Sequence, residues 1–416
     1  MKTLQDQLIA VKKASYDLPF ISHEIKTKVI KDIADALILE QNAIINENQA
    51  DLARLDPNDP KYDRLLLNPE RILSMANSLN ELIHFDSPIH QIVEEKRLPN
   101  GLLLQRITVP FGVIGMIYES RPNVTLDAFA LTFLSSNACV LKGGSEAVES
   151  NKILCKIICD CLKKENISTD IILLMPPTRD AVMELLSSPK YIDVIIPRGS
   201  QSLINFVKQN SQIPIIETGA GVVHVFFDRS GDIEKGKKII TNAKTRRVSV
   251  CNALDCLIIH QDRLIDLPAL LSDLVGKQVM LLADEPSFTI LEDIYPQTLL
   301  EPATNADFGT EFLALKMAIK TVENFDDAIE HIRNYSSSHS DAIIAEDKNS
   351  IQAFFDKVDS AVVYANASTA FTDGGEFGMG GEIGISTQKL HVRGPFSMQH
   401  LVSSKWQVTG NGQIRS

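Results

Sequence analysis

Short hydrophobic runs alternate with longer amphipathic stretches through the middle of the chain. Apolar runs at 137–142, 171–176 and 191–197 are each followed by a stretch with helical spacing, and Thr178 is placed to cap the second of these helices. Strands that are buried on both faces have such continuous runs, and helices connect them when the strands are parallel. The pattern therefore predicts βαβ units and a parallel sheet.

A second alternating block runs from about residue 233 to residue 360. Its predicted elements are helix 232–244, strand 254–260, helix 263–275, strand 313–321, helix 325–335 and strand 341–345. Two such blocks in 416 residues indicate an α/β protein with more than one domain.

The two ends of the chain have different patterns. Residues 1–55 have helical spacing, and residues 56–72 are polar and punctuated by proline, which predicts a connection. A hairpin at 99–109 leads into a buried strand, and the Gly- and Thr-rich tail 361–416 predicts irregular or β structure. One face of the N-terminal helices carries the apolar positions Ile30, Ile33, Ala34 and Leu37.

Composition excludes several classes of protein. A net charge of −12 and a pI near 5.3 argue against nucleic-acid binding, which requires a basic surface. No apolar stretch is long enough to span a bilayer, and residues 1–14 mix charges with apolar positions, unlike a signal peptide. The six cysteines are sparse for this length. We therefore expect a cytoplasmic protein with no membrane partner.

Two predicted strand–helix junctions carry glycine and serine. Lys142-Gly143-Gly144-Ser145 follows the first strand, and Pro197-Arg198-Gly199-Ser200 follows the third. Glycines let a phosphate approach the backbone, and a helix N-terminus offers N–H donors to it. One such junction is equally a glycine turn with a serine cap. Two in one sheet favour a dinucleotide lying across the carboxyl ends of the strands.

Cys251 and Glu217 are candidates for catalysis. Cys251 precedes an apolar strand and follows Lys244, Arg246 and Arg247, whose charges would stabilise a thiolate if the chain folds back on itself. A buried structural thiol is the alternative. Glu217 ends a predicted apolar strand at 213–216, which is a position typical of an active-site acid or base and also of a surface glutamate at a turn.

The other cysteines and the histidines show no metal-ligand spacing. Cys155, Cys159 and Cys161 have helical spacing, which predicts packing in a helix rather than zinc binding. Cys256 is expected in the core. The nine histidines contain no ligand pair, and His224 is expected to be a hydrogen-bonded strand histidine. The sequence therefore predicts no metal site.

Several segments resemble the aldehyde dehydrogenase superfamily and, more specifically, its γ-glutamyl phosphate reductase (glutamate-5-semialdehyde dehydrogenase) branch. Together they extend along nearly the whole chain: VPFGVIGMIYESRPNVT (109–125), LKGGSEA (141–147), PRGS (197–200), NAKTRRVSVCNAL (242–254), GEFGMGGEIGIST (375–387) and KLHVRGP (389–395). The elements SRPNVT, VCNAL and HVRGP are specific to the reductase branch.

The resemblance implies an aldehyde-dehydrogenase-like α/β fold. Residues 1–232 would form a Rossmann-like cofactor domain and residues 233–360 a smaller α/β catalytic domain. The tail 361–416 would return to the cofactor domain and join the 99–109 hairpin in a β oligomerisation element. A homodimer or homotetramer is therefore expected.

The resemblance also implies the cofactor contacts. Lys142, Gly199 and Ser200 match positions that bind the cofactor, and Glu311 matches the glutamate that holds the nicotinamide ribose. Ser145 stands where NAD-preferring relatives have a glutamate for the adenosine ribose. A serine there removes the repulsion of a 2′-phosphate, and Lys142 would attract it, so NADP(H) is the expected cofactor.

For catalysis, Cys251 matches the nucleophile and Asn123 is our candidate for a donor to the oxyanion. Glu217 matches the general base of the superfamily, although reduction of an acyl phosphate needs no base to activate water. Two residues beside the nucleophile depart from the family, with Val248 in place of the usual proline and Arg246 in place of a neutral residue. Candidates for binding the substrate's phosphate are Arg121, Arg247 and Arg393.

The implied activity is NADPH-dependent reduction of L-glutamyl 5-phosphate to L-glutamate 5-semialdehyde through a cysteine thioester, the second step of proline biosynthesis from glutamate. Functional coupling to glutamate 5-kinase is an accompanying expectation. Two alternatives remain, a hydrolytic NAD(P)-dependent aldehyde dehydrogenase and a catalytically silent nucleotide-binding protein on the same scaffold.

Overall fold

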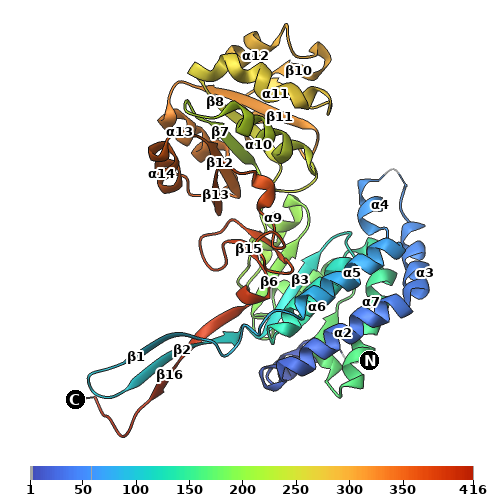
Figure 1. The fold of residues 1–416 in the computed structure, drawn as a ribbon. Coiled ribbons are helices and arrows are strands. Elements are labelled where there is room, and N and C mark those ends of the chain that lie inside the picture. The colour runs from blue at the N-terminus through green and yellow to red at the C-terminus, as the bar shows by residue number, and fades with distance from the viewer. Residues whose placement is uncertain (1–2, 58, 416) are drawn as a thin grey trace. The chain divides into compact units, whose positions relative to one another are not determined.

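The computed structural model describes residues 3–57 and 59–415 and forms two compact units. Both combine parallel sheets with helices, which confirms the predicted α/β class (Figure 1). Unit 1 comprises Met1–Thr218, Gly378–Gly384 and Phe396–Ser416, and unit 2 comprises Gly219–Phe377 and Ile385–Pro395. Within the described residues, no helix combines the length and the apolar composition needed to cross a bilayer.

A four-stranded parallel sheet with the order β5-β4-β3-β6 lies in unit 1. Its strands, in that order, are β5 (Ile172–Leu174), β4 (Ala138–Lys142), β3 (Val113–Tyr118) and β6 (Val194–Arg198). The apolar runs at 137–142, 171–176 and 191–197 therefore do form parallel strands. Because the strands are parallel, the loops after β3, β4 and β6 emerge at the same edge of the sheet.

Nine described helices belong to unit 1. They are α1 (Leu4–Ser15), α2 (His23–Leu39), α3 (Gln41–Leu52), α4 (Pro60–Leu65), α5 (Pro69–Leu82), α6 (Asn123–Leu134), α7 (Val148–Lys164), α8 (Arg179–Leu186) and α9 (Gln201–Asn210). The predicted apolar face of α2 is confirmed, since Ile30, Ile33, Ala34 and Leu37 are all buried. The connection expected at 56–72 is wrong in part, because Asp59 and Asn68 cap α4 and α5 within it.

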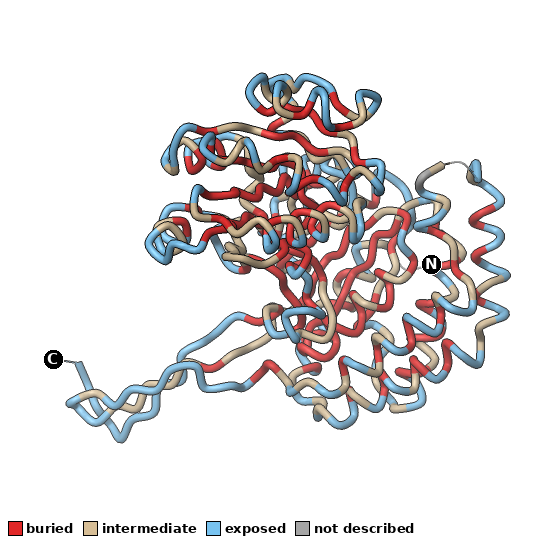
Figure 2. Tube along the Cα trace, turned by 45° about the horizontal axis from the view of Figure 1, so that its top comes forward, coloured by how far each residue is buried: buried red, intermediate tan, exposed pale blue. Residues whose placement is uncertain are grey.

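A three-stranded antiparallel sheet with the order β1-β2-β16 completes unit 1. It contains β1 (Ile92–Arg97), β2 (Leu103–Pro110) and β16 (Val402–Thr409), so the predicted hairpin is confirmed and the tail supplies a third strand. Every residue of β1 is exposed, and β16 is exposed after Val402 (Figure 2). A three-stranded sheet with so little buried surface has only marginal stability in water by itself.

Unit 2 contains a seven-stranded parallel sheet with the order β10-β9-β11-β8-β7-β12-β13. The strands are β10 (Leu300–Pro302), β9 (Met280–Ala283), β11 (Lys316–Val322), β8 (Leu254–His260), β7 (Val223–Phe227), β12 (Ser340–Ile344) and β13 (Val362–Ala365). Two short strands, β14 (Gly384–Ser386) and β15 (Gly394–Phe396), form a separate two-stranded sheet.

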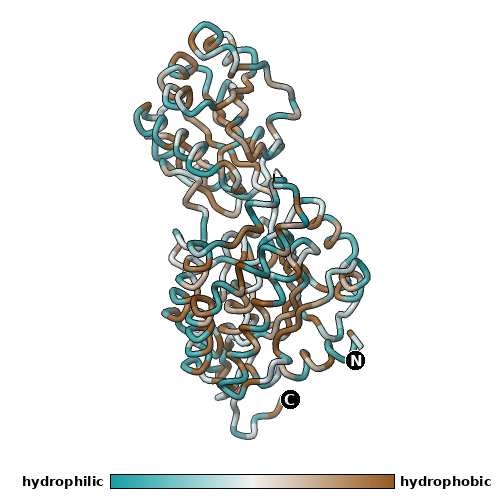
Figure 3. The backbone as a smooth tube through the Cα atoms, turned by 90° about the vertical axis from the view of Figure 1, so that its right-hand side faces the viewer, coloured by the Kyte–Doolittle hydropathy of each residue, from teal (hydrophilic) through white to brown (hydrophobic). Residues whose placement is uncertain are grey.

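Helices cover both faces of the seven-stranded sheet. One face packs against α10 (Ile233–Thr245), α11 (Leu267–Val275) and α12 (Glu285–Leu291). The other packs against α13 (Phe325–Tyr335) and α14 (Lys348–Lys357). Alternate residues of β7 and β8 therefore point into two different cores, and hydrophobic segments lie inside each unit (Figure 3).

Three predicted elements are shorter or different in the structure. The strand expected from residue 313 begins at Lys316, because Leu313 has a φ of 50°, outside the strand region. The helix expected from residue 263 starts as a 3₁₀ turn, and α11 begins at Leu267 with Pro268 in its first turn. The apolar stretch 213–216 makes only an isolated parallel bridge, between Ile215 and Ile195.

Candidate active site

Two glutamates connect the loops at the carboxyl edge of the unit 1 sheet. Glu119, directly after β3, accepts hydrogen bonds from the Ser200 N–H (2.9 Å) and hydroxyl (3.3 Å). Glu146, after β4, accepts from the Ser120 N–H and hydroxyl, both at 2.6 Å. Loops from three strands are therefore fixed to one another. Sequence analysis missed both carboxylates, although a glutamate directly after a buried strand was the signal used for Glu217.

Ser120 occupies a strained backbone position at this edge. Its φ is 44°, in the left-handed region that residues other than glycine rarely adopt, and its side chain is buried. Such outliers persist where neighbouring groups hold them and often mark functional sites. The Glu146 carboxylate is that group here. Burial alone would raise the pKa of Glu146, but the hydrogen bonds from Ser120 bring it below its ordinary value.

A pocket of about 210 Å³ opens beside the Lys142-Gly143-Gly144 turn. Apolar atoms dominate its lining. Its walls are Gly143, Gly144, Val148, Asn151, Lys152, Leu174, Met175, Pro176 and Pro177. A Cβ on Gly143 would lie 2.3 Å from the Asn151 amide, so the turn needs glycine for close packing. The turn and the first residues of α7 thus form a concave surface that suits a flat, largely apolar ligand group.

Lys142 and Ser145 border this turn. Lys142 is buried, and its ammonium donates to the Gly143 carbonyl at 2.9 Å. Burial lowers the pKa of Lys142, against an opposing effect of Glu146. Ser145 is exposed at the start of a 3₁₀ turn (Ser145–Ala147). The carboxylate of Glu146, the residue after this serine, accepts hydrogen bonds from Ser120.

Gly199 and Ser200 form the second junction, after β6. The Ser200 hydroxyl caps α9 by accepting from the Leu203 N–H at 3.4 Å. A Cβ on Gly199 would lie 2.6 Å from the Glu119 carboxylate, so a glycine at this position leaves the space that the carboxylate occupies. Both features of the predicted junction, a glycine turn and a serine cap, are present, and Glu119 adds a negative charge to it.

Arg121 and Asn123 follow Ser120 at the same edge. Asn123 is the first residue of α6, and its amide donates to the Asp127 carboxylate one turn later at 3.0 Å. Burial raises the pKa of Asp127 to about 6. Arg121 is exposed. Glu217, also in unit 1, is half-buried and makes an ion pair of 3.0 Å with Lys208 on α9.

Cys251 lies in unit 2, in the loop between α10 and β8, and is half-buried. The backbone of Gly221 packs directly on it, because a Cβ on Gly221 would lie 1.6 Å from the Cys251 carbonyl oxygen. The Gly221 N–H donates to Glu311 Oε1 at 3.0 Å. Burial raises the pKa of Glu311, although this hydrogen bond opposes the rise. Unit 2 therefore brings two of the predicted site residues, Cys251 and Glu311, to one glycine.

The residue after Cys251 fixes this loop. The Asn252 amide donates to the Thr372 carbonyl at 2.9 Å, and the Thr369 hydroxyl donates to the Asn252 carbonyl at 2.8 Å. Asn252 is buried, so these bonds hold the loop without competition from water. The segment 369–372, which sequence analysis placed in an irregular tail, thus supports the Cys251 loop.

A buried ion pair lies behind the same loop. The Lys244 ammonium is 3.7 Å from Asp255 Oδ1 and donates to the Leu254 carbonyl at 2.7 Å. Asp255 also accepts the Phe312 N–H (3.1 Å) and the Val223 N–H (3.4 Å). Burial lowers the pKa of Lys244 to about 8 and raises that of Asp255 to about 6, each opposed by the partner's charge. Sequence analysis missed Asp255 because it stands within an apolar run.

The cations expected to stabilise the Cys251 thiolate are not equivalent. Lys244 is neutralised by Asp255, and Arg246 lies 4.0 Å from Glu376, so neither offers an uncompensated charge. Arg247 is exposed. Arg393 donates to the Asp359 carboxylate at 2.8 Å and to its carbonyl at 2.5 Å, so its guanidinium already has a structural pairing.

The remaining cysteines and His224 were expected in packing positions. Cys155 and Cys161 are buried on α7, as predicted, whereas Cys159 on the same helix is only half-buried. Cys256 is buried on β8. His224 is a buried strand residue, but the expectation that its ring is hydrogen-bonded is wrong, because neither ring nitrogen has a partner among the described residues. His224 lies close to Cys256 and His331 in space. His331 is 107 positions later in the sequence, so local spacing could not predict that the two histidines meet.

Comparisons with known proteins give the family. No protein-family model matches the chain. A γ-glutamyl phosphate reductase of Legionella pneumophila is 55% identical over 412 residues, 99% of each chain. The crystal structure of a γ-glutamyl phosphate reductase from Thermotoga maritima is 37% identical, with a TM-score of 0.95 and complete coverage of both chains. An engineered glycolyl-CoA reductase with bound NADP⁺ shares the fold at 17% identity and a TM-score of 0.67, over 98% of this chain and 97% of its own.

Proposed function

The chain belongs to the γ-glutamyl phosphate reductase family, and on this premise we propose that it reduces L-glutamyl 5-phosphate to L-glutamate 5-semialdehyde, releasing phosphate. The observation that carries the proposal is the packing of Gly221 on Cys251, with Glu311 on the same glycine. This packing supports the proposal that the nucleophile and a cofactor contact are both held by the short segment around Gly221. The reaction would serve proline biosynthesis from glutamate in the cytoplasm.

The pocket beside Lys142 supports a nicotinamide cofactor. Its apolar walls suit an adenine ring, and the backbone N–H groups at Gly144 and the following turn suit phosphate oxygens. We propose Lys142, Ser145, Gly199 and Ser200 as contacts to the adenosine and diphosphate parts and Glu311 as the contact to the nicotinamide ribose. When bound, the reduced cofactor supplies the hydride.

NADP(H) is the proposed form of the cofactor. Ser145 carries no charge and is exposed, so it would not repel a 2′-phosphate. Glu146 is turned to Ser120 by two hydrogen bonds of 2.6 Å and does not replace the missing ribose-binding carboxylate. The NADP⁺ bound by the engineered glycolyl-CoA reductase of the same fold agrees with this choice.

In the proposed mechanism the Cys251 thiolate attacks the acyl carbon, the C–O bond to phosphate breaks, and a thioester forms on Cys251. The Cys251 backbone N–H would stabilise the oxyanion, and we propose Asn123 as a side-chain donor by resemblance. Addition of a hydride to the thioester carbonyl would give a thiohemiacetal oxyanion, whose C–S bond would break to leave the aldehyde and return the thiolate to Cys251.

Phosphate binding is assigned to exposed arginines. Arg121 and Arg247 are both exposed and could present a bidentate guanidinium to a phosphate. Arg393 would first have to leave Asp359. We propose a lesser part for Glu217, since acyl-phosphate reduction uses no activated water and its carboxylate is paired with Lys208.

Assembly into a homodimer or homotetramer is proposed through the β1-β2-β16 sheet. The exposed apolar side chains Ile92, Val93, Trp406 and Val408 lie on its two outer strands. Exposed apolar strands of this kind are typical of subunit contacts. Functional coupling to glutamate 5-kinase would follow from the lability of the acyl phosphate.

The test is the reverse reaction with purified protein, glutamate 5-semialdehyde and either NADP⁺ or NAD⁺. We expect reduction of NADP⁺ that depends strictly on inorganic phosphate and is abolished in Cys251→Ala, with cofactor binding intact. Cys159→Ala, a half-buried cysteine on α7, is the matched control and keeps the activity. Oxidation without phosphate would favour a hydrolytic dehydrogenase, and no absorbance change at all would favour a silent nucleotide-binding protein.

A further inference from the structure

Two histidines and a cysteine meet in the core of unit 2. His224 on β7 and Cys256 on β8 are register partners on adjacent parallel strands. His331 comes from α13, the helix that covers this face of the sheet. One ligand atom from each residue lies within 4.8 Å of the other two, and all three residues are buried.

The hydrogen bonding of this cluster is incomplete. Both ring nitrogens of His224 are buried without a hydrogen-bond partner among the described residues. Its Nδ1 lies 3.6 Å from Asp341 Oδ1, beyond a normal hydrogen bond. Buried polar groups are nearly always satisfied, so a histidine with both nitrogens unpaired indicates that a ligand completes the site.

The separation of Cys256 and His331 agrees with a metal ion between their ligand atoms. With metal–nitrogen bonds of about 2.0–2.1 Å and a metal–sulfur bond of about 2.3 Å, tetrahedral or trigonal geometry places nitrogen and sulfur roughly 3.6–3.8 Å apart. The observed separation of Cys256 Sγ and His331 Nε2 is 3.7 Å. A plain hydrogen bond would satisfy that pair but would leave His224 unexplained.

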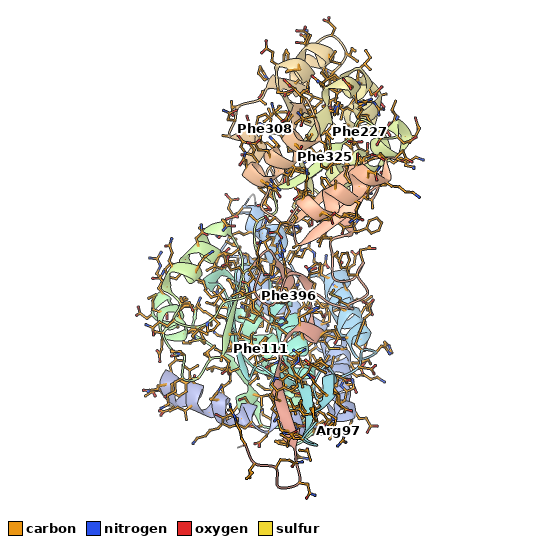
Figure 4. The ribbon with its side chains drawn as sticks, turned by 90° about the vertical axis from the view of Figure 1, so that its left-hand side faces the viewer. Arg97, Phe111, Phe227, Phe308, Phe325 and Phe396 are labelled. Carbon is orange, nitrogen blue, oxygen red and sulfur yellow. The ribbon has the colours of Figure 1, made fainter. Side chains whose placement is uncertain are left out.

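The surroundings have the features of a metal site. Asp341 lies on the Nδ1 side of His224, as in carboxylate–histidine–metal arrangements, which leaves Nε2 for the ion. Asp341 itself accepts hydrogen bonds from the Ser336 hydroxyl (2.7 Å) and from the backbone N–H of His224 (2.9 Å). Phe308, labelled in Figure 4, packs edge-on against the His331 ring at 5.2 Å and helps to exclude water.

We propose that His224, Cys256 and His331 bind one d¹⁰ metal ion, Zn²⁺ or Cu⁺. Imidazole and thiolate are the donors these ions prefer, whereas Mg²⁺ and Ca²⁺ prefer oxygen. The ion joins two strands to the helix that covers them, and β8 is the strand that follows the Cys251 loop. The role of this ion is to stabilise unit 2, and it takes no part in the reduction. Metal binding would release the thiol proton of Cys256 to solvent.

The test uses full-length protein in a Cys251→Ser background, which removes the half-buried Cys251 thiol as a competing ligand. Protein produced with Zn²⁺, or with Cu⁺ under anaerobic reducing conditions, is treated with chelator, and its metal content and affinity are measured. We expect about one ion per chain for at least one metal. Cys256→Ala and His224→Phe should weaken binding by about 100-fold or more, and Cys161→Ala, a buried cysteine on α7, should not.

X-ray absorption of the metal-loaded Cys251→Ser protein keeps the proposal testable if the ligand variants fail to fold. One sulfur at about 2.3 Å with nitrogen neighbours at about 2.0 Å supports the site. A shell of only nitrogen and oxygen, binding unchanged in Cys256→Ala, or no retention of either ion would overturn it. Binding of Zn²⁺ alone or Cu⁺ alone identifies the ion.

Discussion

Loss of the Asp255 carboxylate is expected to destabilise unit 2 and to weaken cofactor binding. Asp255 is the charge partner of the buried Lys244 and accepts the N–H groups of Phe312 and Val223. Phe312 follows Glu311, and Val223 lies two residues after Gly221, the glycine that packs on Cys251. The substitution Asp255→Ala therefore removes a hydrogen-bond acceptor both from the segment that carries Glu311 and from the segment that follows Gly221.

The magnitude follows from the burial of the pair. Removing one partner of a buried ion pair typically costs about 3–5 kcal/mol, because the other charge is left uncompensated. Lys244 can reduce this cost by losing its proton, since burial already lowers its pKa to about 8. We therefore expect a loss of about 3 kcal/mol at neutral pH, at the lower end of that range. The deficit should shrink as the pH rises toward 8, because the pKa of Lys244 falls further once the charge of Asp255 no longer raises it, so the variant loses this proton at a lower pH than the wild type.

Urea unfolding followed by circular dichroism measures the loss, and the KM for NADP⁺ in the phosphate-dependent reaction measures the effect on Glu311. We expect this KM to rise by about tenfold, equivalent to about 1.4 kcal/mol. The matched control is Lys244→Met/Asp255→Asn, which removes both charges and keeps an oxygen for the Phe312 N–H. It should recover most of the stability. An Asp255→Ala protein with wild-type stability and KM would refute the reasoning.

Four further variants test other parts of the account. Ser145→Glu should raise the KM for NADP⁺ about tenfold or more and leave that for NAD⁺ little changed, because it adds a charge that repels a 2′-phosphate; equal effects on both would contradict this role. Arg247→Ala should raise the KM for phosphate about tenfold. Arg393→Ala should raise this KM less, because the Arg393 guanidinium is already paired with Asp359. Burial lowers the pKa of Lys26 from 10.5 to about 8, so the folded chain binds fewer protons than the unfolded chain between these values. Its stability should rise with pH there, and Lys26→Met should remove that contribution; an unchanged pH profile would argue against it.

Most strands of the two parallel sheets were predictable because they lie in apolar runs, but the short strands β9, β10 and β13 were not predicted. Residues 254–260 were predicted as a strand, and β8 has these bounds. The glycine turns after β4 and β6 were predictable for the same reason. The serine cap is present after β6, where Ser200 caps α9, but the 3₁₀ turn after β4 has no side-chain cap. The short helix α4 was missed even though Asp59 before Pro60 is a helix-start signal.

The supporting contacts were not predictable, because they join residues that are distant in the sequence. Asp255 pairs with Lys244 only because α10 packs on β8, and the Glu146–Ser120 bond depends on β3 and β4 being neighbours. For the same reason, the sequence could not predict that His224 and His331 lie close together. Local spacing identifies single residues at strand ends, and sheet order decides which of them meet.

The central claim is that Cys251 carries the acyl group as a thioester, and one rapid-mixing experiment tests it. Enzyme is mixed with glutamate 5-semialdehyde and NADP⁺ in the absence of phosphate, and NADPH formation is recorded. The account predicts a burst of about one NADPH per active site, then a stop until phosphate releases the acyl group, with no burst in Cys251→Ser. Continuous NADPH formation without phosphate, or a full burst in Cys251→Ser, would contradict it.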